Sequence, residues 1–478
     1  MATARDDAQD LATFGYRQDL NRTLGSFSAF AAGFSYMSVL TGLFQTFAFG
    51  FAAGGTTLLW SWPMVFAGQF VVALGFAELA AHYPLSGGVY QWSKLIGSAF
   101  LGWLVGWTYI ACLIVTLAAV ALALQSTLPQ IWPGFQMTGL ASMNAVVLGC
   151  VLLIMSTWLN SSGVGLLAKV NNAGVFAELA GVVILIAALF FRSVRPANQL
   201  VSRPDPGPLL VSAAVTASYV LYGFDTAASL AEETEDPRRK APRAILRALS
   251  ATSALGMLVL FFALMAARDP LAVELGRASG GLSWLVKDVL GGRFGTAILC
   301  DVVFAFTVCA LATHAGAVRL MFAMARDGKL PFSGLLSRVS PDSKTPVVPA
   351  IVAGAAAIGI LVINVNLPRL IELITMVAAL WANLAYLFVT TALLRRRFAG
   401  RQISEDSEAG SAFTLGRWGL PVNVVGALWS AFMVLNLGWP RAAVYGADWQ
   451  SRFAPLLLTV SLLAVGASFY LYLRRHPA

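Results

Sequence analysis

Five acidic residues of the 478-residue chain stand inside long apolar stretches. An acidic side chain at membrane depth is energetically expensive and is usually retained for a function. Glu78 and Glu372 lie near the ends of their stretches, where a structural ion pair or a position at the membrane surface explains them. Asp225 and Glu178 lie deeper, and Asp301 is the fifth. We therefore take Asp225 and Glu178 as the candidates for proton or cation chemistry.

Two of the apolar stretches also contain residues that interrupt a helix. Small and hydroxyl-bearing residues cluster in 34–47 (FSYMSVLTGLFQTF), and a glycine precedes Asp225 in 222–226 (YGFDT). Unwound backbone inside a membrane is tolerated only where it lines a cavity or is covered by protein. Ordinary close packing of small residues is the alternative explanation. The residues in question are Ser35, Ser38, Thr41 and Gly42 in the first stretch and Tyr222, Gly223, Phe224, Asp225 and Thr226 in the second.

The composition is that of a polytopic membrane protein. Hydrophobic residues make up 58% of the chain and charged residues 12%, whereas charged residues make up about 25% of an average chain. The mean hydropathy is +0.74, and several apolar stretches exceed the roughly 18 residues that cross a bilayer. Residues 1–24 are polar and lack the apolar core of a cleavable signal peptide. The four cysteines (Cys112, Cys150, Cys300 and Cys309) fall in apolar segments, which predicts free thiols and no metal site.

Twelve spans are expected, so both termini lie on one side of the membrane. The termini and even-numbered loops hold 22 of the 32 Lys and Arg residues, and the odd-numbered loops hold 10. The positive-inside rule places both termini in the cytoplasm. The formal charge of +9 is thus an orientation signal, and we expect no nucleic-acid partner. The predicted spans are 26–52, 57–82, 98–126, 139–160, 163–191, 209–232, 245–267, 294–322, 347–366, 369–394, 420–439 and 453–473.

The remaining segments are short. The amphipathic pieces 89–97 and 280–290 are too short to span and are expected at the cytoplasmic and outer surfaces respectively. Residues 401–411 read as a polar cytoplasmic loop. The chain shows no soluble domain and no phosphate-binding loop, which argues against an ATP-driven pump.

The two interrupted spans occupy matching positions if the first ten spans form two sets of five. Span 26–52 opens the first set and span 209–232 opens the second. Interrupted helices at corresponding positions of two halves are the sequence pointer to the substrate site of a secondary transporter.

Several motifs resemble those of the amino acid–polyamine–organocation (APC) superfamily, and the resemblance covers essentially the whole chain. The segments after the second span (AELAAHYPLSGGVYQWSK, 77–94), around the sixth (GFDTAASLAEETEDPRRKAPRAI, 223–245) and at the end of the eighth (VRLMFAMARDGKLP, 318–331) resemble its conserved segments. Residues 14–30, 35–44 and 415–429 are similar to the amino acid/choline transporter branch, which includes carriers for γ-aminobutyrate, choline and amino acids.

The resemblance implies an all-α polytopic fold of the LeuT type. Two five-helix inverted repeats, about 26–191 and 209–394, would form a transporter core over 26–394 with the first and sixth helices discontinuous. A cytoplasmic tail (1–25), a cytoplasmic loop (395–419), two peripheral helices (420–473) and a second tail (474–478) would complete the chain.

The resemblance also implies where a substrate binds. Relatives carry Gly-Ser-Gly or Gly-Ala-Gly at the first break, and this chain departs from that pattern. Tyr219 falls where relatives place an aromatic gate. An N-cap role for Asp225 is the alternative to a place in the site. The site residues carried over are Ser38, Val39, Leu40, Thr41 and Gly42 at the first break and Tyr219, Tyr222, Gly223, Phe224 and Asp225 at the second.

Glu178 is the expected coupling residue. In proton-coupled relatives a similar Asn-Asn segment is followed six residues later by a lysine that faces the first and eighth helices, and the count from Asn172 reaches Glu178. A carboxylate there could pick up and release a proton. Direct sodium binding with Thr307 or Thr313 is the second possibility, and a structural bond to a hydroxyl of the first span is the third.

The expected function is secondary active transport of a small amine-bearing solute, such as an amino acid, γ-aminobutyrate or choline, with a proton as coupling ion. A substrate exchanger, a sodium-coupled carrier and a non-transporting nutrient sensor remain open. A membrane enzyme is disfavoured because His82, His314 and His476 are scattered and no nucleophile–base pair stands out. We expect no catalytic residue, metal or cofactor. The Ala- and Arg-rich composition favours a bacterial inner membrane.

Overall fold

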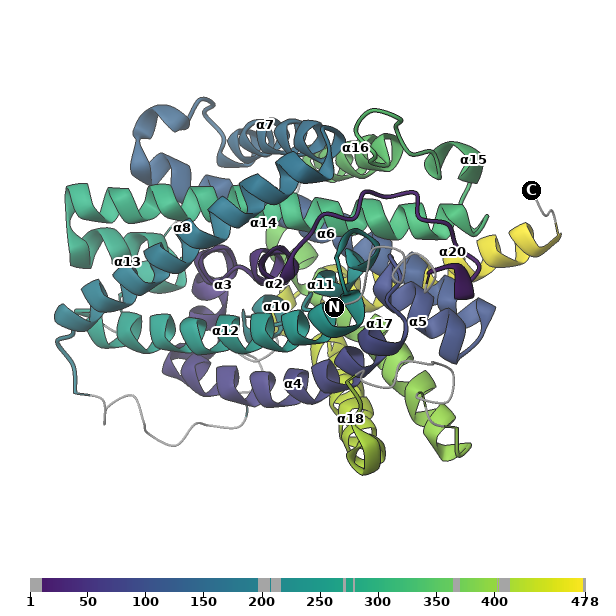
Figure 1. Ribbon diagram of the computed structural model, residues 1–478. Coiled ribbons are helices and arrows are strands. Elements are labelled where there is room, and N and C mark those ends of the chain that lie inside the picture. The colour runs from purple at the N-terminus through teal and green to yellow at the C-terminus, as the bar shows by residue number, and fades with distance from the viewer. Residues whose placement is uncertain are drawn as a thin grey trace.

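The computed structural model describes residues 11–196, 207, 216–269, 272–277, 280–363, 370–401, 403 and 413–475. Helices make up most of these residues, and the pairing of Leu24 with Thr234 is an isolated bridge between extended segments. Figure 1 shows the long helices packed side by side in one bundle.

Nine helical segments among the described residues are long and apolar enough to cross a membrane. One of them, Ser26–His82, holds two predicted spans. The chain is therefore a multi-pass membrane protein. Segment Ser26–His82 contains α4 (Leu58–His82). The other eight segments correspond to α6 (Ala99–Ile131), α7 (Ala141–Ser161), α8 (Val164–Phe191), α12 (Pro237–Ala266), α14 (Gly292–Arg326), α17 (Leu370–Phe398), α18 (Gly419–Gly438) and α20 (Trp449–Arg475), and α16 (Val347–Ile363) is a shorter apolar helix.

Short helices join the long ones. The two predicted amphipathic pieces are helical, as α5 (Gly88–Ile96) and α13 (Gly281–Leu290). Two further short helices, α15 (Ser333–Leu336) and α19 (Ala442–Tyr445), lie in connecting segments. Most of the predicted loop 401–411 falls outside the described residues.

The core of the bundle surrounds α6 and α17. In α6 and in α17, 83% of an apolar 18-residue stretch of the helix is buried inside the protein. The corresponding buried share is 33% in α18 and 11% in α20. Indole groups fasten α20 to the outside of α6: Trp103 Nε1 donates to the Gly466 carbonyl at 2.9 Å. A side chain at Gly466 would collide with the Trp107 ring. The apolar surface of α18 and α20 thus faces outward, as expected where lipid is the solvent.

The first predicted span is interrupted, as the sequence predicts. It consists of α2 (Ser26–Met37) and α3 (Val39–Gly54), which meet at Ser38. The sixth predicted span, 209–232, is interrupted as well: α10 (Ser218–Val220) and α11 (Thr226–Ser229) flank a non-helical segment, and η5 (Ala231–Glu233) follows. Its first residues, 209–215, lie outside the described part.

One boundary differs from the prediction. The basic run that precedes predicted span 245–267 is part of the helix, because α12 begins at Pro237. Proline at the first helical position loses no hydrogen bond and has the right φ for a helix. The consequence is that the arginines of this run extend along α12 and do not form a loop.

Glu78 near the end of α4 has the structural role that its position predicts. Its carboxylate is paired with Arg397 of α17, and its Oε1 accepts from the Leu415 backbone N–H at 3.0 Å. This ion pair joins α4 and α17 to the segment before α18.

Candidate functional site

The first break is organised by the Ser38 side chain. Ser38 has φ 9° and ψ 108°, outside the helical region, and its Oγ accepts from the Thr41 N–H at 3.1 Å. A hydroxyl in this position supplies a partner for one of the unpaired N–H groups that begin a helix. As a result, α2 ends at Met37 and α3 begins at Val39, with Ser38 as the one residue between them.

The second break depends on Gly223. Its φ is +90°, a conformation that residues with a Cβ rarely adopt. A Cβ at this position would also lie 1.9 Å from Cε1 of Tyr36. The Gly223 N–H donates to the Tyr386 hydroxyl at 2.8 Å, so α17 holds the unwound segment.

The two breaks lie against each other. A Cβ added to Gly42 of α3 would be 2.5 Å from Val220 Cγ2, so this glycine permits the close approach of α3 and α10. The Tyr36 and Tyr222 rings pack edge to face with centroids 5.7 Å apart. The two segments predicted to form one site are therefore adjacent.

Asp225 is fully buried at the second break. Its Oδ1 accepts from the Tyr109 hydroxyl of α6 at 2.7 Å and from the Tyr386 hydroxyl of α17. Its Oδ2 has no hydrogen-bond partner among the described residues. The side chain makes no capping bond to α11, so the alternative in which it serves as a helix N-cap is wrong. Asp225 thus keeps one oxygen available inside the bundle.

Glu178 of α8 reaches the first break. Its Oε1 accepts from Ser38 Oγ at 2.8 Å and from the Leu40 N–H at 3.2 Å. The Glu178 side chain is almost completely buried, and no described residue bonds its Oε2. The bond to a hydroxyl of the first span is therefore present. In addition, the carboxylate lies at the N-terminus of α3, where free N–H groups and the helix dipole favour negative charge.

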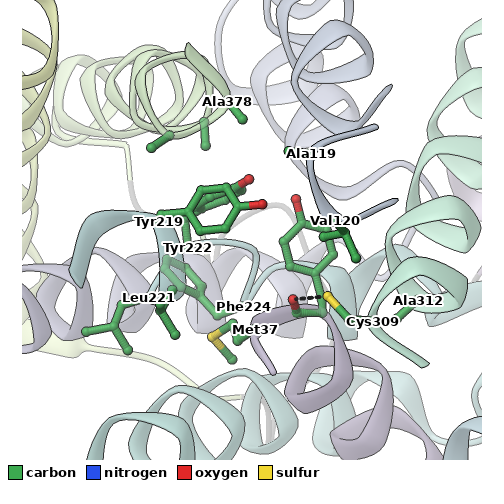
Figure 2. Packing of buried hydrophobic residues seen from close by; sticks show 14 of the residues in the cluster. Met37, Ala119, Val120, Tyr219, Leu221, Tyr222, Phe224, Cys309, Ala312 and Ala378 are labelled. Atoms are coloured by element: carbon green, nitrogen blue, oxygen red, sulfur yellow. Dashed lines mark hydrogen bonds between the residues drawn. The ribbon is translucent and has the colours of Figure 1, made fainter. Parts of the chain in front are cut away.

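Aromatic and hydroxyl side chains fill the space around the breaks. Tyr222 and Thr116 of α6 share a hydrogen bond of 2.6 Å, and the Tyr219 hydroxyl donates to Gln45 Oε1 at 3.4 Å. Figure 2 shows Tyr219 and Tyr222 grouped with Leu221 and Phe224, and the dashed line marks the bond from Cys309 Sγ to the Tyr36 carbonyl. Phe224 packs at 5.1 Å from the Tyr386 ring.

The residues that could bind sodium differ in their surroundings. Thr307 is half-buried and donates to Val303 O of its own helix at 3.0 Å. Thr313 is buried, and its Oγ1 has no partner among the described residues. In the part of the chain that the structure describes, no group of three or more His, Cys, Asp or Glu side chains could hold a metal ion. His314 is bonded to Ser156 and to the Ala350 carbonyl, which accounts for its burial.

Two buried acids that follow α11 pair with two arginines of α14. We call Glu232, Glu233, Arg319 and Arg326 the acid–arginine cluster. Arg319 pairs with Glu233 at 3.0 Å and Arg326 pairs with Glu232 at 2.8 Å. The sequence predicts that these acids pair with the basic run at 238–247 when the site is closed toward the cytoplasm, and a solvated run of charges is the alternative. That prediction is wrong for Glu232 and Glu233, whose carboxylates pair with arginines of α14, whereas Glu235 pairs with Lys240 of the run at 3.2 Å.

The N-terminal segment, residues 11–25, lies across this cluster. The Thr23 and Leu24 N–H groups donate to the Glu233 carbonyl at 3.0 and 2.9 Å. The Tyr16 hydroxyl donates to Asp327 Oδ1 at 2.8 Å, and Lys94 pairs with the same carboxylate at 2.6 Å. This segment therefore closes the end of the bundle at which α2 begins (Figure 1).

Tyr109 and Tyr386 belong to the candidate site, although the sequence did not indicate them. Each is a single tyrosine in an apolar span, and they are 277 positions apart in the chain. Only the packing of α6 against α17 brings their hydroxyls to Asp225.

The chain resembles known transporters over nearly its full length. It is 27% identical to the amino-acid permease BAT1 of Arabidopsis thaliana, with 98% of this chain and 94% of the relative covered. It is 27% identical to the branched-chain amino acid permease BcaP of Bacillus subtilis, with 98% and 97% covered. It is 28% identical to the methylthioribose transporter of the same bacterium, with 75% and 78% covered. The amino acid permease family model matches residues 24–463, and the chain therefore belongs to this family of the APC superfamily, whose members are transporters and not enzymes.

Proposed function

We propose that the chain is a secondary active transporter that carries a small amine-bearing solute by alternating access, with a proton as coupling ion. An amino acid, γ-aminobutyrate or choline would fit this description. The similar proteins, two amino acid permeases and a methylthioribose transporter, support a small polar solute.

The observation that carries the proposal is the pair of buried carboxylates at the adjoining breaks. Asp225 and Glu178 each bond only hydroxyl or N–H groups, and each has one oxygen without a partner among the described residues. No lysine or arginine described in the structure forms an ion pair with either. A cationic amine would supply the missing positive charge, because a buried charge is costly unless it is paired.

The ammonium end of a substrate would bind beside Asp225. The C-terminal ends of α2 and α10 point their carbonyl groups toward the breaks, and helix C-termini favour positive charge. Broken helices that present their ends in this way form the substrate sites of many secondary transporters. Tyr219 and Phe224 would enclose the solute, and Ser38 to Gly42 would line its other side.

Glu178 would couple a proton to substrate binding by competing for the N-terminus of α3. While charged, Glu178 holds the Leu40 N–H, which a substrate carboxylate would also need. Protonation removes the negative charge of Glu178 and weakens its attraction to the helix N-terminus. A carboxylate-bearing substrate and a proton would then bind together and leave together.

Alternating access would require the acid–arginine cluster to open. A small cavity reaches from Thr226, the residue after Asp225, to Arg319 of the cluster. Its other lining includes Ser28 and Asn171, which are polar. Separation of the N-terminal segment and of the Arg319–Glu233 pair would extend this cavity to the surface, while closure would isolate the site.

The proposal includes the LeuT-type arrangement and the division of the chain into a core (26–394), a cytoplasmic loop (395–419) and two peripheral helices (420–473). Cytoplasmic tails at 1–25 and 474–478 and a bacterial inner membrane complete it. The excess of Lys and Arg at the end of the bundle that holds the acid–arginine cluster supports the cytoplasmic assignment.

Uptake into proteoliposomes tests the function. Labelled amino acids, γ-aminobutyrate, choline, ethanolamine, polyamines and methylthioribose would be offered to the purified chain. We expect saturable uptake of at least one amine-bearing solute, and counterflow of that solute would distinguish a carrier or exchanger from a sensor. Binding of a solute without counterflow would contradict transport, and uptake that needs sodium and ignores pH would contradict proton coupling.

A further inference from the structure

A cavity outside the candidate site lies between the N-terminus of α6 and the C-terminal half of α17. Its volume is about 550 Å³. Its lining includes Ile96 at the end of α5, and Phe100 of the lining packs on Tyr470 of α20. The candidate site and this cavity share no lining residue.

One end of the cavity is basic. Arg395, Arg396 and Arg401 line it, and Arg395 and Arg401 are exposed. No acidic residue lines it among the described residues. The next residue in sequence, Arg397, turns inward to Glu78 and does not contribute. The arginines of this end are therefore set apart from the structural ion pair of the same helix.

The other end of the cavity is apolar. Phe388 and Ala392 lie one to two helical turns deeper in the bundle than Arg395 and Arg396, at about 1.5 Å per residue. Phe100 of α6 faces the same space with 43% of its surface exposed, and it packs on Tyr470 of α20. The lining thus changes from basic to apolar along the direction of the helices.

We propose that this cavity binds the phosphate group of an anionic phospholipid, with its acyl chains against Phe100 and Phe388. Guanidinium groups bind phosphate through paired N–H donors. Basic pockets between membrane helices are typical sites for anionic headgroups. Free phosphate shares the headgroup chemistry, but it would leave the apolar half of the cavity unused.

Native mass spectrometry of the full chain tests the proposal. The purified protein would be exposed to equal amounts of phosphatidylglycerol and phosphatidylcholine, and the ratio of retained lipids measured. We expect wild type to prefer phosphatidylglycerol. The variant R395Q/R396Q/R401Q should lose roughly tenfold or more of that preference, since each basic residue near an anionic surface contributes on the order of fivefold.

Two further variants show whether the lipid preference comes from the cavity or from the overall charge of the protein surface. R338Q/K344Q/R417Q removes three exposed charges away from the cavity lining and should keep the wild-type ratio. Thr391→Trp fills the apolar half without a change of charge and should lower phosphatidylglycerol retention. This second variant decides the matter if the arginine variant does not fold.

Several results would overturn the assignment. One is a wild-type protein with no preference between the two lipids. Others are a preference that survives both the triple arginine variant and Thr391→Trp, or one that falls equally in R338Q/K344Q/R417Q. Full displacement of phosphatidylglycerol by excess inorganic phosphate would make free phosphate the ligand.

Discussion

At the scale of single residues, the site is defined by two carboxylates with different partners. Asp225 is held by two tyrosine hydroxyls, and Glu178 is held by a serine hydroxyl and a backbone N–H. The first arrangement leaves a negative charge for an amine, and the second places one at a helix N-terminus. This difference assigns amine recognition to Asp225 and proton coupling to Glu178 in the proposed mechanism.

Neutralising Asp225 should impair transport of amine-bearing solutes. Asp225→Asn keeps the shape of the side chain but removes its charge, and a hydrogen bond to a charged group contributes about 1.5–3 kcal/mol. We expect a loss of roughly 10- to 100-fold in substrate affinity with unchanged membrane insertion. The exposed Asp342→Asn serves as control. Unchanged uptake of every accepted solute by Asp225→Asn would rule out this role.

A bulky side chain at Gly42 should block the site. Leucine there would push against Val220, which already lies within 2.5 Å of the place a Cβ would take. Gly359 of α16 has open space around it, so Gly359→Leu is the matched control. Thermal-shift titration with an accepted solute is the measurement. Substrate affinity equal to wild type in Gly42→Leu would place the site elsewhere.

At the scale of helices, the sequence predicted the long apolar helices among the described residues and both breaks. Apolar length and the small and hydroxyl residues near Ser38 and Gly223 were sufficient, because those properties act locally. The partners of Glu232 and Glu233 were predicted wrongly: the nearest basic run was chosen, whereas the arginines come from α14, 86 to 94 positions away. Tyr109 and Tyr386 were missed for the same reason, since only the packing of distant helices makes them partners of Asp225.

Removal of Arg319 should destabilise the closed end of the bundle. Arg319 and Glu233 are both fully buried, and breaking a buried pair on one side costs about 3–5 kcal/mol. We expect Arg319→Gln to lower the Tm of the purified protein clearly, while the exposed Arg338→Gln leaves it unchanged. A double variant, Arg319→Gln with Glu233→Gln, should recover part of the loss. Equal Tm values for wild type and Arg319→Gln would contradict a stabilising role for this pair.

In the molecule as a whole, α8 would link a proton to the proposed substrate site. Glu178 of α8 bonds residues at the break between α2 and α3, so its charge state would affect the half-helix that is proposed to bind substrate. Among the residues that the structure describes, Asp225 and Glu178 are the two buried acids with hydrogen bonds at the breaks. A single substitution can therefore separate coupling from binding.

Uptake into liposomes with imposed gradients tests this claim most directly. An inward pH gradient without sodium should drive accumulation of an accepted solute by wild type. Glu178→Gln should no longer respond to the gradient, yet should still exchange internal for external solute. If Glu178→Gln accumulates solute with the same dependence on the pH gradient as wild type, Glu178 is not the coupling residue.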